Sequence, residues 1–266
     1  LDEGKLVLRN VPNLADIKSM ALVLQQLGIK IERRGNEMTL SVINDTITRA
    51  PYELVSKMRA SVCVLGPLVG KRRRAEVSMP GGCSIGDRPI DLHLKGLAAL
   101  GASVAVERGY VIASARRLQG NSMYLGGPYG STVTGTENVM MAAVLAPGTT
   151  IIECAACEPE VQDCARLLNK MGARIEGIGS PRLTIHGVKK LHGCTWDIMP
   201  DRIEAGTFMA AAAMTGGDVS IERVNPDHLM CVTEILRQAG AHVETGADWI
   251  RVIGNGLFRH VNVATL

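Results

Sequence analysis

The chain has 266 residues, of which 46% are apolar and only 3% aromatic, and its formal net charge is +3. This composition predicts an aliphatic core, and the length allows one or two domains. The small charge argues against a nucleic-acid partner, and no apolar stretch is long enough to span a membrane. We see no secretory signal, and the seven cysteines form no disulfide framework, so we expect a cytoplasmic location.

In chain order, the hydrophobic pattern predicts α/β structure built from similar units. The predicted strands lie at 6–10, 75–79, 103–107, 110–113, 149–154 and 219–222, and the predicted helices at 52–69, 90–100, 136–145, 159–171, 203–214 and 227–239. Each full unit therefore follows the order βαβαββ. The chain opens on the second strand of a unit and closes on a strand-like run at 261–266. We therefore expect a longer protein, of which this chain holds about three and a half units.

Internal repetition is visible in four segments that each read as a short strand, a helix and a glycine-containing turn into another strand. Their glycines, Gly28, Gly101, Gly172 and Gly240, are separated by 73, 71 and 68 residues. The preceding strands end 18, 22, 18 and 18 residues before these glycines. The second unit therefore carries four extra residues at a strand-to-helix junction, a place where function is commonly added to a repeated scaffold.

The extra residues fall in a glycine-rich loop that contains Cys83 and Arg88. Glycines give the backbone freedom, and an arginine offers a planar fork that suits phosphate or carboxylate. A thiol held beside a cation ionises more readily than free cysteine. The loop alone fits either a surface turn or a site for covalent or acid–base chemistry, and its position in the repeat favours the second interpretation.

The remaining cysteines and histidines suggest no metal or cofactor. Cys154 and Cys157 have CxxC spacing, but no second pair or histidine spacing completes a zinc site. The pair follows a strand, whereas a thioredoxin-like motif normally begins a helix. Cys63 and Cys164 fall within apolar helical patterns and are predicted core residues. We therefore expect neither metal nor cofactor.

Long motifs in this sequence resemble the UDP-N-acetylglucosamine 1-carboxyvinyltransferase family, the enolpyruvyl transferases of peptidoglycan synthesis. The stretch 80–93, which includes Cys83, is similar to the catalytic loop of that family. Stretches 50–55, 58–61, 65–68, 158–160 and 199–207 extend the similarity along the chain. The resemblance implies an inside-out α/β barrel of βαβαββ repeats. It implies a nearly complete three-repeat domain at 1–199 and the first returning repeat of a second domain at 200–266.

The resemblance also implies a reaction. The enolpyruvyl group of phosphoenolpyruvate would pass to the 3-hydroxyl of UDP-N-acetylglucosamine with release of phosphate. This is the first committed step of peptidoglycan synthesis, and it ties the protein to cell-wall biogenesis, cell shape, the cell cycle and cell division. Cys83 would be the catalytic acid and the covalent target of the inhibitor fosfomycin, because a thiol can act as both acid and nucleophile.

Further site residues follow from the resemblance alone. Asp201 and Arg202 would lie at the interdomain hinge and pair across the cleft. The loop at 130–133 departs from the family pattern. The residues that would hold the substrates are Arg59, Arg88, Pro89, Ile90, Asp91, Leu92, Ser131, Thr132 and Val133.

The family's Lys-Asn pair for phosphoenolpyruvate would precede Leu1. The aspartate near the sugar hydroxyl, and further arginines, would follow Leu266. We therefore expect this chain alone to be inactive. Two alternatives stay open. The sister enzyme that acts on 3-phosphoshikimate shares the fold but uses no such cysteine, and a non-catalytic nucleotide-sugar-binding paralogue would carry Cys83 and Arg88 as relics.

Overall fold

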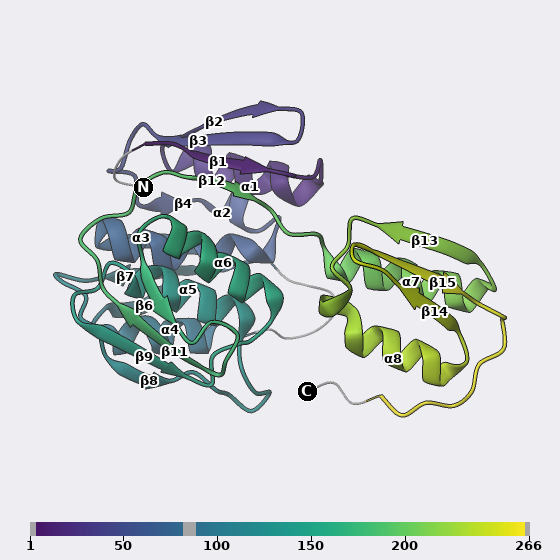
Figure 1. Cartoon of the computed structure of the whole chain (residues 1–266). Coiled ribbons are helices and arrows are strands. Elements are labelled where there is room, and N and C mark those ends of the chain that lie inside the picture. Colours follow the sequence, from purple (N-terminus) through teal and green to yellow (C-terminus); the bar gives the residue numbers. More distant parts are fainter. Residues whose placement is uncertain (1–3, 82–88, 264–266) are drawn as a thin grey trace. The chain divides into compact units, whose positions relative to one another are not determined.

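The computed structural model describes residues 4–81 and 89–263, and it divides the chain into two compact units (Figure 1). The first unit is Leu1–Ile198 and the second is Met199–Leu266. Each has its own hydrophobic core. We describe them one at a time.

The first unit contains three repeats. The first has β1 (Leu6–Arg9), α1 (Ala15–Gln26), β2 (Ile29–Arg34) and β3 (Glu37–Val42). The second has β4 (Arg49–Ala50), α2 (Tyr52–Val55), the 3-10 helix η1 (Arg59–Val64), α3 (Leu65–Arg72), β5 (Arg74–Ser78), α4 (Asp91–Ala99), β6 (Ser103–Glu107) and β7 (Tyr110–Ser114). The third has β8 (Ser122–Tyr124), α5 (Val133–Ala143), β9 (Thr149–Glu153), α6 (Pro159–Lys170), β10 (Arg174–Glu176) and β11 (Arg182–His186), and β12 (Thr195–Asp197) follows it.

The second unit holds the fourth repeat. It consists of α7 (Arg202–Thr215), β13 (Asp218–Glu222), the 3-10 helix η2 (Pro226–Leu229), α8 (Met230–Ala239), β14 (His242–Thr245) and β15 (Trp249–Ile253). Its core is formed mainly by α7, α8 and the inner face of the sheet.

The sheets repeat one topology. In the first unit the strand orders are β12-β1-β3-β2, β4-β5-β7-β6 and β8-β9-β11-β10. The first pair of each sheet is parallel and the other pairs are antiparallel. The second unit has the order β13-β15-β14, with antiparallel pairs. The predicted βαβαββ pattern is therefore present in the described residues.

Helix α5 is at the centre of the first unit, where it packs against α3, α4 and α6 (Figure 1). Two glycines allow this close packing. A Cβ atom at Gly66 of α3 would lie 2.0 Å from the carbonyl oxygen of Asn138, and one at Gly96 of α4 would lie 2.3 Å from Val139. The sheets lie outside these helices, as in an inside-out barrel.

The predicted helix at 52–69 is wrong as one element, because the structure divides it into α2, η1 and α3. Pro67 explains the last break. A proline inside a continuous helix removes one backbone donor and clashes with the preceding turn. Since α3 begins at Leu65, Pro67 falls in its first turn, where that donor is not needed. The strand-like run at 261–266 is also not a strand in its described part, 261–263.

The repeat also governs backbone conformation. The turn glycines Gly28, Gly101, Gly172 and Gly240 all have positive φ, between 82° and 106°. These angles are easy for glycine and costly for other residues.

Directly after β1, β9 and β13, a non-glycine residue takes the left-handed conformation. Asn10 has φ 58°, Cys154 has φ 58° and Arg223 has φ 55°. Met79, at the end of β5 in the repeat with the extra residues, does not. The conformation of Cys154 is therefore a property of the repeat.

Candidate active site

The predicted nucleotide-sugar residues gather at two helix N-termini. Ile90 is the buried N-cap residue of α4, and Asp91 is its exposed first residue. Leu92 packs over Gly127, where an added Cβ would lie 3.2 Å from the leucine Cδ1 atom. Helix N-termini carry unpaired backbone N–H groups and a partial positive charge, which suit an anion.

Helix α5 supplies the second N-terminus. Thr132 caps it, since Oγ1 of Thr132 accepts a hydrogen bond of 3.2 Å from the backbone nitrogen of Gly135. Ser131 is exposed just before the cap. A short turn precedes it, in which the backbones of Gly127 and Gly130 bond to each other at 2.8 and 3.0 Å. The helix therefore begins three residues earlier than the sequence pattern predicted.

Buried polar contacts join these two helix ends. Nε2 of His93, in the first turn of α4, lies 3.2 Å from Oγ1 of Thr134 in the first turn of α5. Nδ1 of His93 lies 2.9 Å from Nδ2 of Asn138. Burial, the nearby Arg59 and an opposing effect of Asp91 together lower the pKa of His93 to about 4. His93 is therefore neutral near pH 7.

Arg59 is the first residue of η1 and is half-buried. Helix η1 packs against α5, and the charge of Arg59 contributes to the lowered pKa of His93. The structure thus brings Arg59, the segment 89–92 and the segment 131–133 into one region of the first unit. Cys83 and Arg88 lie outside the described residues.

A cavity of about 440 Å³ adjoins Ser131, and sequence reasoning did not identify its other lining residues. They are Cys154, Ala155, Cys157, Glu158 and Pro181. The loop at 154–158 is the third repeat's counterpart of the cysteine loop, because both follow the first full-length strand of their repeat. The sequence alone could have indicated this equivalence, because the repeats align the two loops.

Glu137 of α5 is a half-buried acid beside this region. Its pKa is raised to about 7, first by burial and then by the negative charges of Glu160 and Glu158. Two thiols nearby are also perturbed: burial, with a smaller effect of Glu137, raises the pKa of Cys63 to about 12 and also raises that of Cys164. These thiols are poor nucleophiles, which agrees with their predicted core positions.

Asp201 has a structural role in the second unit. Its Oδ1 atom accepts hydrogen bonds from the backbone nitrogens of Ile203 at 2.8 Å and Glu204 at 3.1 Å, which caps α7. Arg202 is the first residue of that helix. Their predicted pairing across an interdomain cleft stays a prediction.

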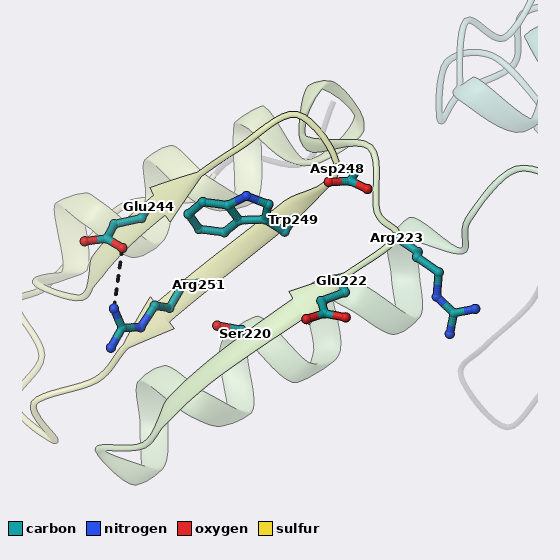
Figure 2. A pocket seen from close by; sticks show the side chains of 7 residues that line it. All are labelled: Ser220, Glu222, Arg223, Glu244, Asp248, Trp249 and Arg251. Carbon is teal, nitrogen blue, oxygen red and sulfur yellow. Dashed lines mark ion pairs between the residues drawn. The ribbon is translucent and has the colours of Figure 1, made fainter.

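A second hollow, of about 470 Å³, lies on the outer face of the β13-β15-β14 sheet. Figure 2 shows Trp249 beside a cross-strand ion pair between Arg251 and Glu244. The guanidinium of Arg251 lies 2.6 Å from a carboxylate oxygen of Asp218 and 3.7 Å from one of Glu244. The charge of Arg251 is therefore balanced by the carboxylates of Asp218 and Glu244. No predicted site residue lines this hollow.

Among residues 4–81 and 89–263, no helix is both long and apolar enough to cross a membrane. In the same residues, no three His, Cys, Asp or Glu side chains are grouped so that they could hold a metal ion.

The sequence profile of the EPSP synthase family, described as 3-phosphoshikimate 1-carboxyvinyltransferase, matches residues 1–266. The chain belongs to this family. Solved members support the fold assignment. The enolpyruvyl transferase NikO from Streptomyces tendae has a TM-score of 0.81 at 20% identity, over 95% of this chain and 60% of that one. EPSP synthase from Acinetobacter baumannii has a TM-score of 0.69 at 22% identity, over 97% of this chain and 60% of that one. The enolpyruvyl transferase fold predicted from the sequence is therefore confirmed.

Curated relatives within this family are much more similar in sequence. A protein of Desulfosudis oleivorans named UDP-N-acetylglucosamine 1-carboxyvinyltransferase is 51% identical over 266 residues, which is 100% of this chain and 63% of the relative. A protein of the same name from Methylacidiphilum infernorum is 50% identical over 97% of this chain and 61% of the relative. The chain therefore spans about 60% of the length of these relatives.

Proposed function

We propose that the protein to which this chain belongs transfers the enolpyruvyl group of phosphoenolpyruvate to the 3-hydroxyl of UDP-N-acetylglucosamine. The observation that carries the proposal is the 51% identity, over the whole chain, to a relative with this activity in its name. The arrangement of two helix N-termini with Arg59 supports it, because a nucleotide sugar carries a diphosphate that such a region suits.

The chemistry proceeds by addition and elimination. The sugar hydroxyl gives its proton to a base and its oxygen bonds to C2 of phosphoenolpyruvate, while Cys83 gives its thiol proton to C3, which forms a tetrahedral ketal and leaves Cys83 as a thiolate. The ketal then loses phosphate from C2, the Cys83 thiolate takes back a proton from C3, and the enolpyruvyl ether remains. A thiol near its pKa suits the protonation step.

The other residues hold and orient the substrates. Arg88 clamps phosphate or carboxylate charge with its planar fork. Arg59 and the segments 89–92 and 131–133 bind the nucleotide sugar. By the family resemblance, the base for the sugar hydroxyl would lie beyond Leu266, and turnover would then need residues that this chain does not contain.

The proposed reaction places the protein in the cytoplasm and in peptidoglycan synthesis, where cell-wall growth links it to cell shape and division. The same thiol gives the proposed inhibitor site. Fosfomycin would add covalently to Cys83, because the thiolate of a cysteine is a nucleophile that can attack an electrophilic inhibitor.

The main alternative is transfer to 3-phosphoshikimate, which the description of the family favours. Cys83 argues against it, since the sister enzyme uses no cysteine acid in this loop. The test uses the protein extended to the full length of its relatives. Phosphate release from phosphoenolpyruvate is measured with each acceptor. We expect release only with UDP-N-acetylglucosamine, and release only with 3-phosphoshikimate would overturn the proposal.

The 266-residue chain serves as a comparison in the same assay. We expect it to release no phosphate with either acceptor. If the extended protein binds UDP-N-acetylglucosamine but releases no phosphate, the non-catalytic paralogue is the better description.

A further inference from the structure

Asn138, at the centre of the first unit, is a fully buried polar residue to which the proposed chemistry gives no role. Its amide makes three hydrogen bonds to three different segments. Oδ1 accepts from the backbone nitrogen of Gly66 at 2.5 Å, and Nδ2 donates to the carbonyl oxygen of Val62 at 2.9 Å. Nδ2 also lies 2.9 Å from Nδ1 of His93.

The backbone partners fix the orientation of this amide. Gly66 can offer only an N–H donor here, so the oxygen of Asn138 must face it. The carbonyl of Val62 can only accept, so the NH₂ group of Asn138 must face that side. Since NH₂ is a donor, Nδ1 of His93 must accept from it.

The state of His93 follows from that assignment. With Nδ1 as acceptor, the ring proton of neutral His93 is on Nε2, from which it is donated to Oγ1 of Thr134 at 3.2 Å. Protonation of Nδ1 would place two donors against each other. The neighbouring charges agree, because Arg59 opposes a second cation more strongly than Asp91 favours it.

We propose that Asn138 is a positioning residue that fixes the neutral Nε2–H form of His93 and thereby sets the spacing of Arg59 and the α4 and α5 N-termini around the nucleotide sugar. Its three partners lie in η1, at the start of α3 and in α4, while Asn138 itself belongs to α5. The inference rests on the proposed function for the identity of the ligand. It does not rest on that function for the state of His93.

The test begins with the 266-residue chain and its histidine ring nitrogen signals. We expect wild-type His93 to show one neutral form, with the proton on Nε2, from pH 8 down to about pH 5. N138D places a carboxylate oxygen near Nδ1, where it favours a proton. We expect His93 in N138D to titrate above its ordinary pKa of about 6.5. Wild-type His93 that titrates near 6.5, or that carries its proton on Nδ1, would overturn the assignment.

The second readout is the affinity for UDP-N-acetylglucosamine, measured by calorimetry at pH 8 on the protein extended to the length of its relatives. We expect N138D to raise the dissociation constant at least ten-fold. Thr134→Val removes the hydroxyl that joins α5 to His93, and it should weaken binding in the same direction, which keeps the test valid where N138D does not fold.

N169D is the matched control. Asn169 of α6 also bridges backbone groups, with bonds of 2.9 and 2.8 Å to Ile175, but it touches no predicted site residue. We expect N169D to leave the affinity unchanged. If N169D and N138D lost the same affinity for UDP-N-acetylglucosamine, Asn138 would contribute to folding stability alone and not to positioning. A wild-type protein, extended to the length of its relatives, that binds no UDP-N-acetylglucosamine would refute both the proposed function and the positioning role, while the His93 assignment would still be decided by its nitrogen signals.

Discussion

The backbone nitrogen of Gly66 lies 2.5 Å from Oδ1 of Asn138, so the first turn of α3 touches the middle of α5 directly. A side chain at position 66 would clash with α5, since its Cβ atom would lie 2.0 Å from the backbone carbonyl oxygen of Asn138. The contact fixes the distance between two helices that support the candidate site.

Gly66→Ala should therefore destabilise the first unit by roughly 2–4 kcal/mol, because a backbone atom must move to admit the methyl group. Gly206→Ala in α7 is the control. A Cβ at Gly206 meets only side-chain carbons at 3.6 and 3.9 Å, so alanine should stabilise that helix by about 0.5–1 kcal/mol. Denaturant unfolding of both variants gives the comparison, and a Gly66→Ala chain as stable as wild type would contradict the packing described.

A second prediction concerns Glu137. Its folded pKa of about 7 exceeds its ordinary value of 4.5, so the folded state binds more protons than the unfolded state between these pH values. The free energy of unfolding should then fall as pH rises from 4.5 to 7, by at most about 3 kcal/mol. The amide of E137Q does not ionise, so the free energy of unfolding of this variant should not fall in the same way. E137Q should therefore be more stable than wild type at pH 8.

His93 contributes with the opposite sign. Its folded pKa of about 4 lies below its ordinary value of 6.5, so its contribution to stability is lost as pH falls through this range. Because His93 is present in both proteins, the difference between wild type and E137Q isolates Glu137. Thermal unfolding between pH 5 and 8 measures it. E107Q replaces an exposed carboxylate at the end of β6, and the stability of this variant should depend on pH as that of wild type does. If E107Q changed the pH dependence as E137Q does, burial would not be the cause.

Much of the fold could be predicted because each repeat needs a glycine at the same turn. The four turn glycines need positive φ, and this requirement recurs at nearly constant spacing. Alternating apolar residues located strands such as β6 at the predicted residues 103–107. The start of α5 was missed because Thr132 caps that helix through its side chain, which lies outside the apolar pattern.

The polar core of the site could not be predicted in the same way. Asn138 and His93 are 45 residues apart, and only tertiary packing brings their side chains to 2.9 Å. The resemblance identified the residues near the ligand, yet it gave no reason to single out Asn138. A buried amide with three partners is visible only after the helices are placed.

Thiol reactivity gives a third prediction. The pKa values of Cys63, Cys164, Cys157 and Cys194 are all raised, with burial as the largest cause, so these thiols should alkylate slowly. Cys231 is exposed and serves as the internal reference. With limiting iodoacetamide, peptide mapping should find Cys83 modified before Cys231. Modification of Cys231 first, or equal labelling of both, would argue against an activated thiol in the loop.

The last prediction concerns the mechanism and uses the protein extended to the length of its relatives. Cys83→Ser should lose phosphate release while it still binds UDP-N-acetylglucosamine, because a serine hydroxyl is a far weaker acid than a thiol. Arg88→Ala should raise the phosphoenolpyruvate KM by about 10- to 150-fold, since a hydrogen bond to a charged group contributes roughly 1.5–3 kcal/mol. Steady-state kinetics with calorimetric binding separates the two effects. Cys231→Ser and Arg166→Ala replace an exposed thiol and an exposed guanidinium that are not among the predicted site residues, and both should behave as wild type. Unchanged kinetics in both loop variants would remove Cys83 and Arg88 from the reaction, because an acid and an anion clamp cannot be lost without effect on turnover or KM.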